Sequence, residues 1–299
     1  MKEGCQMLIV TKPDKPSGRG NQLKPTPVKK WGVEHLITVL EPEHLKGIEF
    51  FKKLCGETPD LIYSAAYGSY IPLEILKLPK LGAVNLHPSL LPLYRGAAPV
   101  QRALMSGAVE TGVTLAYMTE KWDQGEILAQ KKFPISEDDD AGTLLEKLAV
   151  EGVSLIEKIL SRLLQGKAAS IPQDDSKATY ASVIKKEETW IQWEKSAEEV
   201  KNQIRGLSPE PGARTLFQGK QVKILKVKIW EENKPFASNA VGNEIQPGVI
   251  YRIESDGPVV SCGRGSLLLL KVQPESRNIL NGKDFVNGQR VHVSQQFKN

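Results

Sequence analysis

The sequence has few cysteines and no long apolar run. Its three cysteines, Cys5, Cys55 and Cys262, are isolated and odd in number, which argues against a disulfide framework and indicates reduced, structural thiols. No stretch approaches the roughly 20 apolar residues of a membrane-spanning helix. The opening residues MKEGCQMLIV contain too short an apolar run for a signal peptide, and no small-residue cleavage site follows them. We therefore expect a cytoplasmic protein that does not contact a membrane.

Two signatures of catalysis are also missing. No Gly-x-Ser-x-Gly sequence occurs, so a serine nucleophile on a strand-to-helix elbow is excluded. The candidate site described below holds one histidine, one aspartate and no nearby cysteine, which are too few ligands for a bound metal. We expect neither a covalent enzyme intermediate nor a metal cofactor.

The length of 299 residues indicates two domains. In the first part, strand-like segments alternate with helix-like ones, which is typical of an α/β fold with a mostly parallel, Rossmann-like sheet. The strand-like segments are 6–11, 36–40, 60–68 and 127–135, and the helix-like ones are 43–55, 71–78 and the segment that ends at Gly166. The apolar stripe of that last helix, predicted to pack on the sheet, consists of Leu145, Leu148, Ile156, Ile159 and Leu163.

The second part is predicted to be mainly β-structure. Ser196, with Glu199 in the capping-box position, begins a helix that ends near Gly206. Several short strands follow, including a hairpin with its turn at Gln218–Gly219, and this pattern favours a small OB-like β-barrel. We expect a catalytic domain over 1–166, a linker over 167–183 and a barrel domain over 184–299.

Charge is segregated along the chain although the net charge is only +5. Residues 12–30 carry six basic and one acidic side chain, and residues 185–299 carry eighteen basic and thirteen acidic ones, so each segment has a net charge of +5. Residues 31–184 have a net charge of −5. Segment 12–30 also contains four prolines and two glycines and is predicted to be an irregular loop. Basic segments of this kind suit a polyanion, although ordinary solubilising charge explains the counts equally well.

The most informative stretch runs from Asn85 to Asp123. Asn85 and His87 close an apolar segment and project to the same side of an extended backbone, and Asp123 follows the strand-like VTLAYM. An asparagine amide can stabilise an oxyanion, and a histidine oriented by an aspartate can handle protons near neutral pH. The three residues therefore suit direct acyl transfer to an amine. Each also has an ordinary explanation: an Asx-turn for Asn85, a packed histidine for His87 and a turn for Asp123.

The same stretch, NLHPSLLPLYRGAAPVQRAL followed by ETGVTLAYMTEKWDQGEIL, resembles the signature of the folate-dependent formyltransferases. Its motifs are Asn-x-His-x-Ser-Leu-Leu-Pro, Tyr-Arg-Gly, Thr-Gly-Val-Thr and Asp-x-Gly. The resemblance implies that Asn85, His87 and Asp123 are catalytic. It also implies that Ser89, Leu90, Leu91 and Pro92 contact the formyl donor, 10-formyltetrahydrofolate.

The basic segments resemble those of one branch of the family, the methionyl-tRNA formyltransferases. The segment TKPDKPSGRGNQLKPTPVK resembles the branch's tRNA-engaging loop, and TYASVIKKEETWIQW and IRGLSPEPGA resemble the start of its tRNA-binding domain. The partners implied are folate and methionyl initiator tRNA, and the protein is expected to be a monomer. The tRNA is expected to contact the basic residues Lys12, Lys15, Arg19, Lys24, Lys185 and Lys186. Two alternatives remain at this point: an amino-sugar-nucleotide formyltransferase, and a tRNA-binding protein with impaired catalysis.

The resemblance has one gap at its start. Family members open with a strand, a Gly-Thr-Pro turn and a helix before the strand that QMLIVT matches here. We therefore expect the sheet to lack the family's first strand. Such a loss would leave backbone donors and acceptors of the neighbouring strands without partners.

Overall fold

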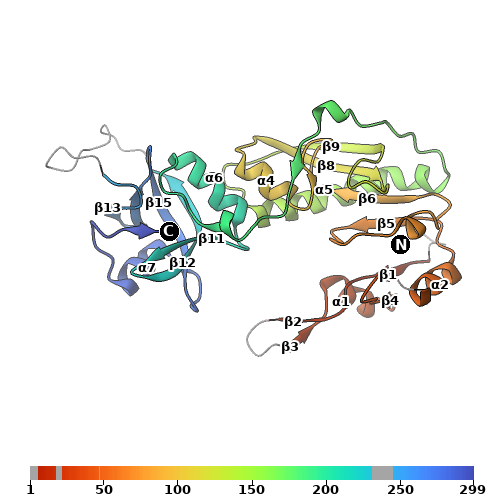
Figure 1. The fold of residues 1–299 in the computed structure, drawn as a ribbon, viewed down its shortest axis with the longest axis horizontal. Helices are drawn as coiled ribbons and strands as arrows, with labels where there is room; N and C mark the ends of the chain where they lie inside the picture. The colour runs from red at the N-terminus through yellow and green to blue at the C-terminus, as the bar shows by residue number, and fades with distance from the viewer. Residues whose placement is uncertain (1–5, 18–21, 47, 231–244) are drawn as a thin grey trace. The chain divides into compact units, whose positions relative to one another are not determined.

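The computed structural model describes residues 6–17, 22–46, 48–230 and 245–299 (Figure 1). The chain divides into two compact units. Unit 1 contains residues 1–87, 115–128 and 159–172, and unit 2 contains residues 88–114, 129–158 and 173–299. Within the described residues, no helix has the length and apolar character needed to cross a membrane.

Unit 1 begins with a small parallel sheet. Strand β1 (Leu8–Val10) pairs in parallel with β4 (Thr38–Leu40), and helix α1 (Pro27–Glu34) connects back to β4. The prediction that segment 12–30 is an irregular loop is wrong for its first part, because β2 (Lys15–Ser17) and β3 (Gln22–Lys24) form a short antiparallel hairpin. Proline at the start of α1 is compatible with a helix because the first N–H groups have no intrahelical acceptor. Arg19 lies outside the described residues.

A four-stranded sheet carries the predicted site. Its order is β5 (Ile62–Ala65), β6 (Ala83–His87), β8 (Glu110–Tyr117) and β9 (Ile127–Pro134), with β5 and β6 parallel. Helices α2 (Ile48–Glu57) and α3 (Leu73–Leu76) flank β5 in sequence. Within the described residues β1 pairs only with β4 and β5 only with β6, so the parallel strands form two sheets rather than one.

Helix α5 (Ala141–Leu164) ends two residues before the predicted terminator Gly166, and its buried face agrees only in part with the predicted stripe. Leu145 is 47% exposed, whereas Leu144 is fully buried. The buried leucines, Leu144, Leu148, Leu155 and Leu163, keep to a spacing of three to four residues and its multiples, as one helix face requires. Leu148 and Leu163 are buried as predicted, whereas Ile156 and Ile159 are half-buried and Leu145 is exposed. The helix begins where the Asp140 carboxylate accepts the Thr143 N–H (2.9 Å) and ends before Gly166, whose φ of 66° places it in the left-handed region.

The C-terminal part of unit 2 is a curled antiparallel sheet, as the OB-like prediction requires. Helix α6 (Ala197–Leu207) has the predicted capping box of Ser196 and Glu199. The sheet order is β13 (Ile250–Glu254), β14 (Gly257–Ser261), β15 (Ser266–Pro274), β12 (Lys220–Ile229), β11 (Ala213–Phe217) and β17 (Phe297–Lys298), with β16 (Leu280–Asn281) on β15. Helix α7 (Gly282–Gln289), which sequence reasoning missed, contributes Phe285 to the core beside Phe217 and Phe297.

Unit 2 also contains the helix that follows the Tyr-Arg-Gly motif. Helix α4 (Pro99–Met105) packs against α6, and Gly206 makes the approach possible because a Cβ there would lie 2.6 Å from the Met105 Cγ. The Arg102 guanidinium donates to both carboxylate oxygens of Glu188, at 2.5 and 3.0 Å. Two short segments, 175–177 and 187–189, form 3₁₀ turns, and β10 (Tyr180–Ala181) pairs with β7 (Arg95–Gly96).

Candidate functional site

The carboxyl end of β6 places two of the three predicted catalytic residues. Asn85 pairs with Ser64 of β5 and is half-buried, and His87 ends the strand with only 4% of its surface exposed. Because side chains alternate along a strand, Asn85 and His87 project to the same face. A parallel strand that ends in polar side chains is where α/β proteins present reactive groups.

The third residue, Asp123, lies in the turn between β8 and β9. Its φ of 54° is in the left-handed region, which aspartate and asparagine tolerate better than most residues. Gly125 fixes this turn, because a Cβ at that position would overlap the carbonyl oxygen of Tyr117 and lie 2.6 Å from its carbon. The Asp-x-Gly motif is therefore explained by a close backbone approach at the end of β8.

The turn brings the Asp123 carboxylate to the imidazole of His87. His87 Nδ1 and Asp123 Oδ1 are 3.6 Å apart, and the two side chains are only 5% and 11% exposed. A carboxylate beside Nδ1 can orient the imidazole and influence which of its ring nitrogens carries the proton. The structure thus brings together His87 and Asp123, which are 36 residues apart in the sequence.

The predicted donor-contacting residues form a tight loop in unit 2. Ser89 is fully buried and its hydroxyl donates to the Leu93 carbonyl at 2.6 Å, so it shapes the loop itself. Leu91 is also buried, whereas Leu90 and Pro92 are half-buried. Leu90 rests on Gly112 of β8, where a Cβ would lie 3.0 Å from the Leu90 Cγ and nearer still to its Cδ2.

The Tyr-Arg-Gly motif has a structural role in unit 2. Arg95 is 2% exposed, and its guanidinium donates to the Gln173 amide oxygen at 2.7 and 3.0 Å and to the Asp175 carboxylate at 2.6 Å. Gly96 has a φ of 120°, and a Cβ there would lie 2.7 Å from the Ala181 carbonyl oxygen. Hydrogen bonds from Arg95 and the close approach of Gly96 to Ala181 therefore hold segment 173–181 against the turn that precedes α4.

The predicted tRNA-binding lysines occupy two exposed places. Lys15 and Lys24 are directly opposite each other in the β2–β3 hairpin, both exposed. Like charges in opposing positions destabilise a strand pair, and a bound anion would relieve that cost. Lys12 instead donates to the Gly68 carbonyl at 3.2 Å. Lys185 and Lys186 are exposed and precede the turn at 187–189 in unit 2.

Not every cation of segment 12–30 is available to a partner. Lys29 forms ion pairs with Asp14 (2.8 Å) and Glu41 (2.9 Å). The hydrogen bond to the Asp14 carboxylate, followed by the one to Glu41, raises the pKa of the Lys29 ammonium. Lys29 therefore links α1 to Asp14 and Glu41, and the exposed positive charge of segment 12–30 comes from its other basic residues.

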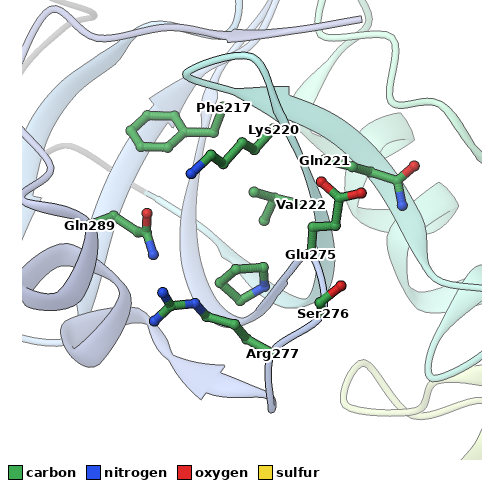
Figure 2. A pocket seen from close by; sticks show the side chains of 9 residues that line it. Phe217, Lys220, Gln221, Val222, Glu275, Ser276, Arg277 and Gln289 are labelled. Atoms are coloured by element: carbon green, nitrogen blue, oxygen red, sulfur yellow. The ribbon is translucent and has the colours of Figure 1, made fainter. Parts of the chain in front are cut away.

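A cavity of about 310 Å³ lies beside the β11–β12 hairpin and the end of β15, and none of the predicted site residues lines it. Figure 2 shows the Lys220, Arg277 and Gln289 side chains on one side of it and Glu275 with Gln221 on the other. The residues that line it include the buried Phe217 and Val222. The mixture of charges does not select one class of ligand.

Comparison with known proteins gives two family matches. Residues 2–160 match the family model described as "Formyl transferase", and residues 183–290 match "Formyl transferase, C-terminal domain". The chain belongs to the formyl transferase family. Among curated members, a methionyl-tRNA formyltransferase of Dictyoglomus thermophilum is 43% identical over 291 residues, covering 97% of this chain and 91% of the relative. The methionyl-tRNA formyltransferase of Bacillus subtilis is 39% identical over 295 residues, covering 98% and 90%.

Solved structures agree with the formyl transferase fold. HypX from Aquifex aeolicus, solved in complex with tetrahydrofolic acid, matches with a TM-score of 0.68 at 17% identity, covering 97% of this chain and 48% of that one. WlaRD, a sugar 3N-formyl transferase, matches with a TM-score of 0.61 at 18% identity, covering 91% and 99%. At these identities the two structures show a shared fold.

Two residues that contact the 89–92 loop were not predicted from the sequence. Thr114 of β8 and Gln130 of β9 both hydrogen-bond to the backbone of the 89–92 loop. Thr114 is the last residue of the Thr-Gly-Val-Thr motif, but the motif does not indicate that its hydroxyl bonds to the 89–92 loop. Gln130 gave no signal, because a polar residue on an edge strand is ordinary.

Proposed function

We propose that the protein transfers a formyl group from 10-formyltetrahydrofolate to the α-amino group of methionyl initiator tRNA, for the initiation of translation. Relatives with 43% and 39% identity over nearly the whole chain are methionyl-tRNA formyltransferases, and this similarity extends through the C-terminal part. The observation that carries the proposal is the buried pair of His87, at the end of β6, and Asp123, in the turn between β8 and β9, because such a pair can act as the general base that the reaction needs.

In the proposed reaction the amine nitrogen forms a bond to the formyl carbon, and the bond from that carbon to the folate nitrogen breaks. The Asn85 amide donates to the oxygen on which negative charge develops. His87, whose Nδ1 faces the Asp123 carboxylate, removes a proton from the attacking amine, and the folate nitrogen gains a proton as it leaves. The scheme requires no covalent enzyme intermediate and no metal.

Recognition of tRNA is assigned to exposed basic residues. Lys15 and Lys24 face each other on the β2–β3 hairpin, and Lys185 and Lys186 lie at the start of the C-terminal region. Arg19 lies outside the described residues and is assigned to the same group from the resemblance of its sequence segment. Contacts from such residues to phosphates make affinity fall as salt rises. Lys12 belongs to the same group by its position, with part of its hydrogen-bonding capacity used by Gly68.

The proposal is tested by transfer of a labelled formyl group. The protein should formylate methionyl initiator tRNA and leave an amino-sugar nucleotide unmodified. Asp123→Asn keeps the left-handed backbone, since asparagine tolerates it, but removes the charge that orients His87. We expect kcat to fall by about 10²-fold or more while both substrates still bind, because general-base catalysis contributes roughly 10²–10⁴-fold. Formyl transfer by Asp123→Asn at the wild-type rate would remove Asp123 from the mechanism.

A further inference from the structure

The 89–92 loop is held by one buried hydroxyl. Thr114, on β8, is fully buried. Its Oγ1 donates to the Ser89 carbonyl at 2.6 Å and accepts the Leu91 N–H at 3.1 Å. The Gln130 side-chain amide donates the third hydrogen bond to this oxygen, at 2.9 Å. A hydroxyl can donate one hydrogen bond and accept two, so Thr114 is saturated in this position.

Gln130, on the neighbouring strand β9, completes the arrangement. The same amide nitrogen donates to the Leu91 carbonyl at 2.7 Å as well as to Thr114. Thr114 and Gln130 together therefore satisfy the carbonyl of Ser89 and both backbone groups of Leu91. Because an unpaired buried backbone group is costly, these bonds fix the path of the loop.

The loop therefore takes its shape from two strands outside it. Leu90 and Pro92 keep part of their surface exposed, whereas Ser89 and Leu91 face inward. Rotating the backbone at Leu91 would exchange these orientations and break the bonds to Thr114 and Gln130. The side chains available to a ligand are thus selected by the hydroxyl of Thr114 and the amide of Gln130.

We infer that Thr114 and Gln130 are positioning residues for the formyl donor: they set the loop backbone on which the donor rests. This inference rests on the proposed function, since that function gives the loop its ligand. It adds two residues that act through Ser89 and Leu91 and that need not contact the substrate themselves.

Three substitutions test the inference, with a matched control. Thr114→Val keeps the shape and removes the hydroxyl, Thr114→Ser keeps the hydroxyl, and Gln130→Leu removes the amide from an exposed residue whose loss should not prevent folding. The control is Thr111→Val on the same strand. Thr111 is 2% exposed, and its hydroxyl has no hydrogen-bond partner among the described residues.

Two measurements give the outcome: the KM values for both substrates, and the Kd of tetrahydrofolate by titration calorimetry. Thr114→Val and Gln130→Leu should raise the donor KM and the Kd about tenfold, the scale of one lost buried hydrogen bond. The KM for tRNA should change less than twofold. Thr114→Ser should restore binding, and Thr111→Val should match the wild type.

The results separate the two proposals. If the wild type transfers formyl groups but Thr114→Val and Gln130→Leu lower only the melting temperature, with donor KM and Kd unchanged, the inference is wrong and the function stands. If the wild type binds tetrahydrofolate but does not formylate tRNA, the function is wrong, and the calorimetric comparison still decides the inference. If the wild type does not bind tetrahydrofolate, both are wrong.

Discussion

The turn that carries Asp123 gives the sharpest test of the site. In Gly125→Ala the new methyl group would overlap the Tyr117 carbonyl oxygen and lie 2.6 Å from its carbon. Non-bonded carbons prefer roughly 3.5–4.0 Å, so the turn must move by about 1 Å or more. That movement acts on a carboxylate already 3.6 Å from His87 Nδ1. Since a misplacement of about 1 Å can cost roughly 10²-fold, we expect kcat to fall by about 10²-fold.

The assay is steady-state formyl transfer, accompanied by thermal unfolding to show that Gly125→Ala is folded at the assay temperature. Overpacking costs about 1–3 kcal/mol, which a domain with a stability of roughly 5–15 kcal/mol tolerates. Gly56→Ala is the control, because a Cβ at this helical glycine has no atom within 4 Å and should leave kcat unchanged. A Gly125→Ala protein with wild-type kcat would refute the link between this turn and the chemistry.

Three further predictions concern other parts of the chain. The Arg102 guanidinium, and then the Lys185 N–H, lower the pKa of Glu188 to about 2, so this stabilisation is present above the ordinary pKa of 4.5 and lost as the pH falls toward 2. Glu188→Gln should therefore reduce the free energy of unfolding by about 1 kcal/mol at pH 7, with a smaller difference at pH 3, measured by urea denaturation. Burial raises the pKa of Cys262 to about 12, so a thiol reagent at pH 8 should label it only after unfolding, as peptide mass spectrometry can show. Arg19→Ala should raise the KM for tRNA and reduce its salt dependence without changing the donor KM; a change in donor KM instead would assign this loop to the donor.

The predictable parts of this fold are those that local chemistry decides. Ser196 with Glu199 specified the start of α6, and Gln218–Gly219 specified a hairpin, because caps and turns depend on neighbouring residues. Helix α7 was missed although Asn281 caps it, since its single core side chain, Phe285, gives almost no periodic pattern. The prediction for α5 was correct at Leu148 and Leu163 but wrong at Leu145, because Leu144 and Leu145 are adjacent leucines that only tertiary packing distinguishes.

The candidate site divides in the same way. Asn85 and His87 could be placed on one face from strand alternation alone, but the approach of Asp123 depends on a turn whose geometry no local rule specifies. Gln130 could not be predicted, since its hydrogen bonds cross from β9 to a loop 39 residues earlier in the chain. Long-range pairings of this kind are visible only in three dimensions.

The glycines of the Tyr-Arg-Gly, Thr-Gly-Val-Thr and Asp-x-Gly motifs lie where the backbone passes close to other atoms. Gly96, Gly112 and Gly125 each lie where an added Cβ would collide with backbone or with the loop: Gly96 against Ala181, Gly112 against Leu90, and Gly125 against Tyr117. None of the three supplies a polar side chain, yet each fixes a segment that holds a predicted functional residue or braces the turn before α4. Substitution of Gly125 should therefore change the placement of Asp123 without altering the chemical groups of the site. Loss of activity on such a change, with folding retained, would show that catalysis here depends on backbone placement as much as on the identity of Asn85, His87 and Asp123.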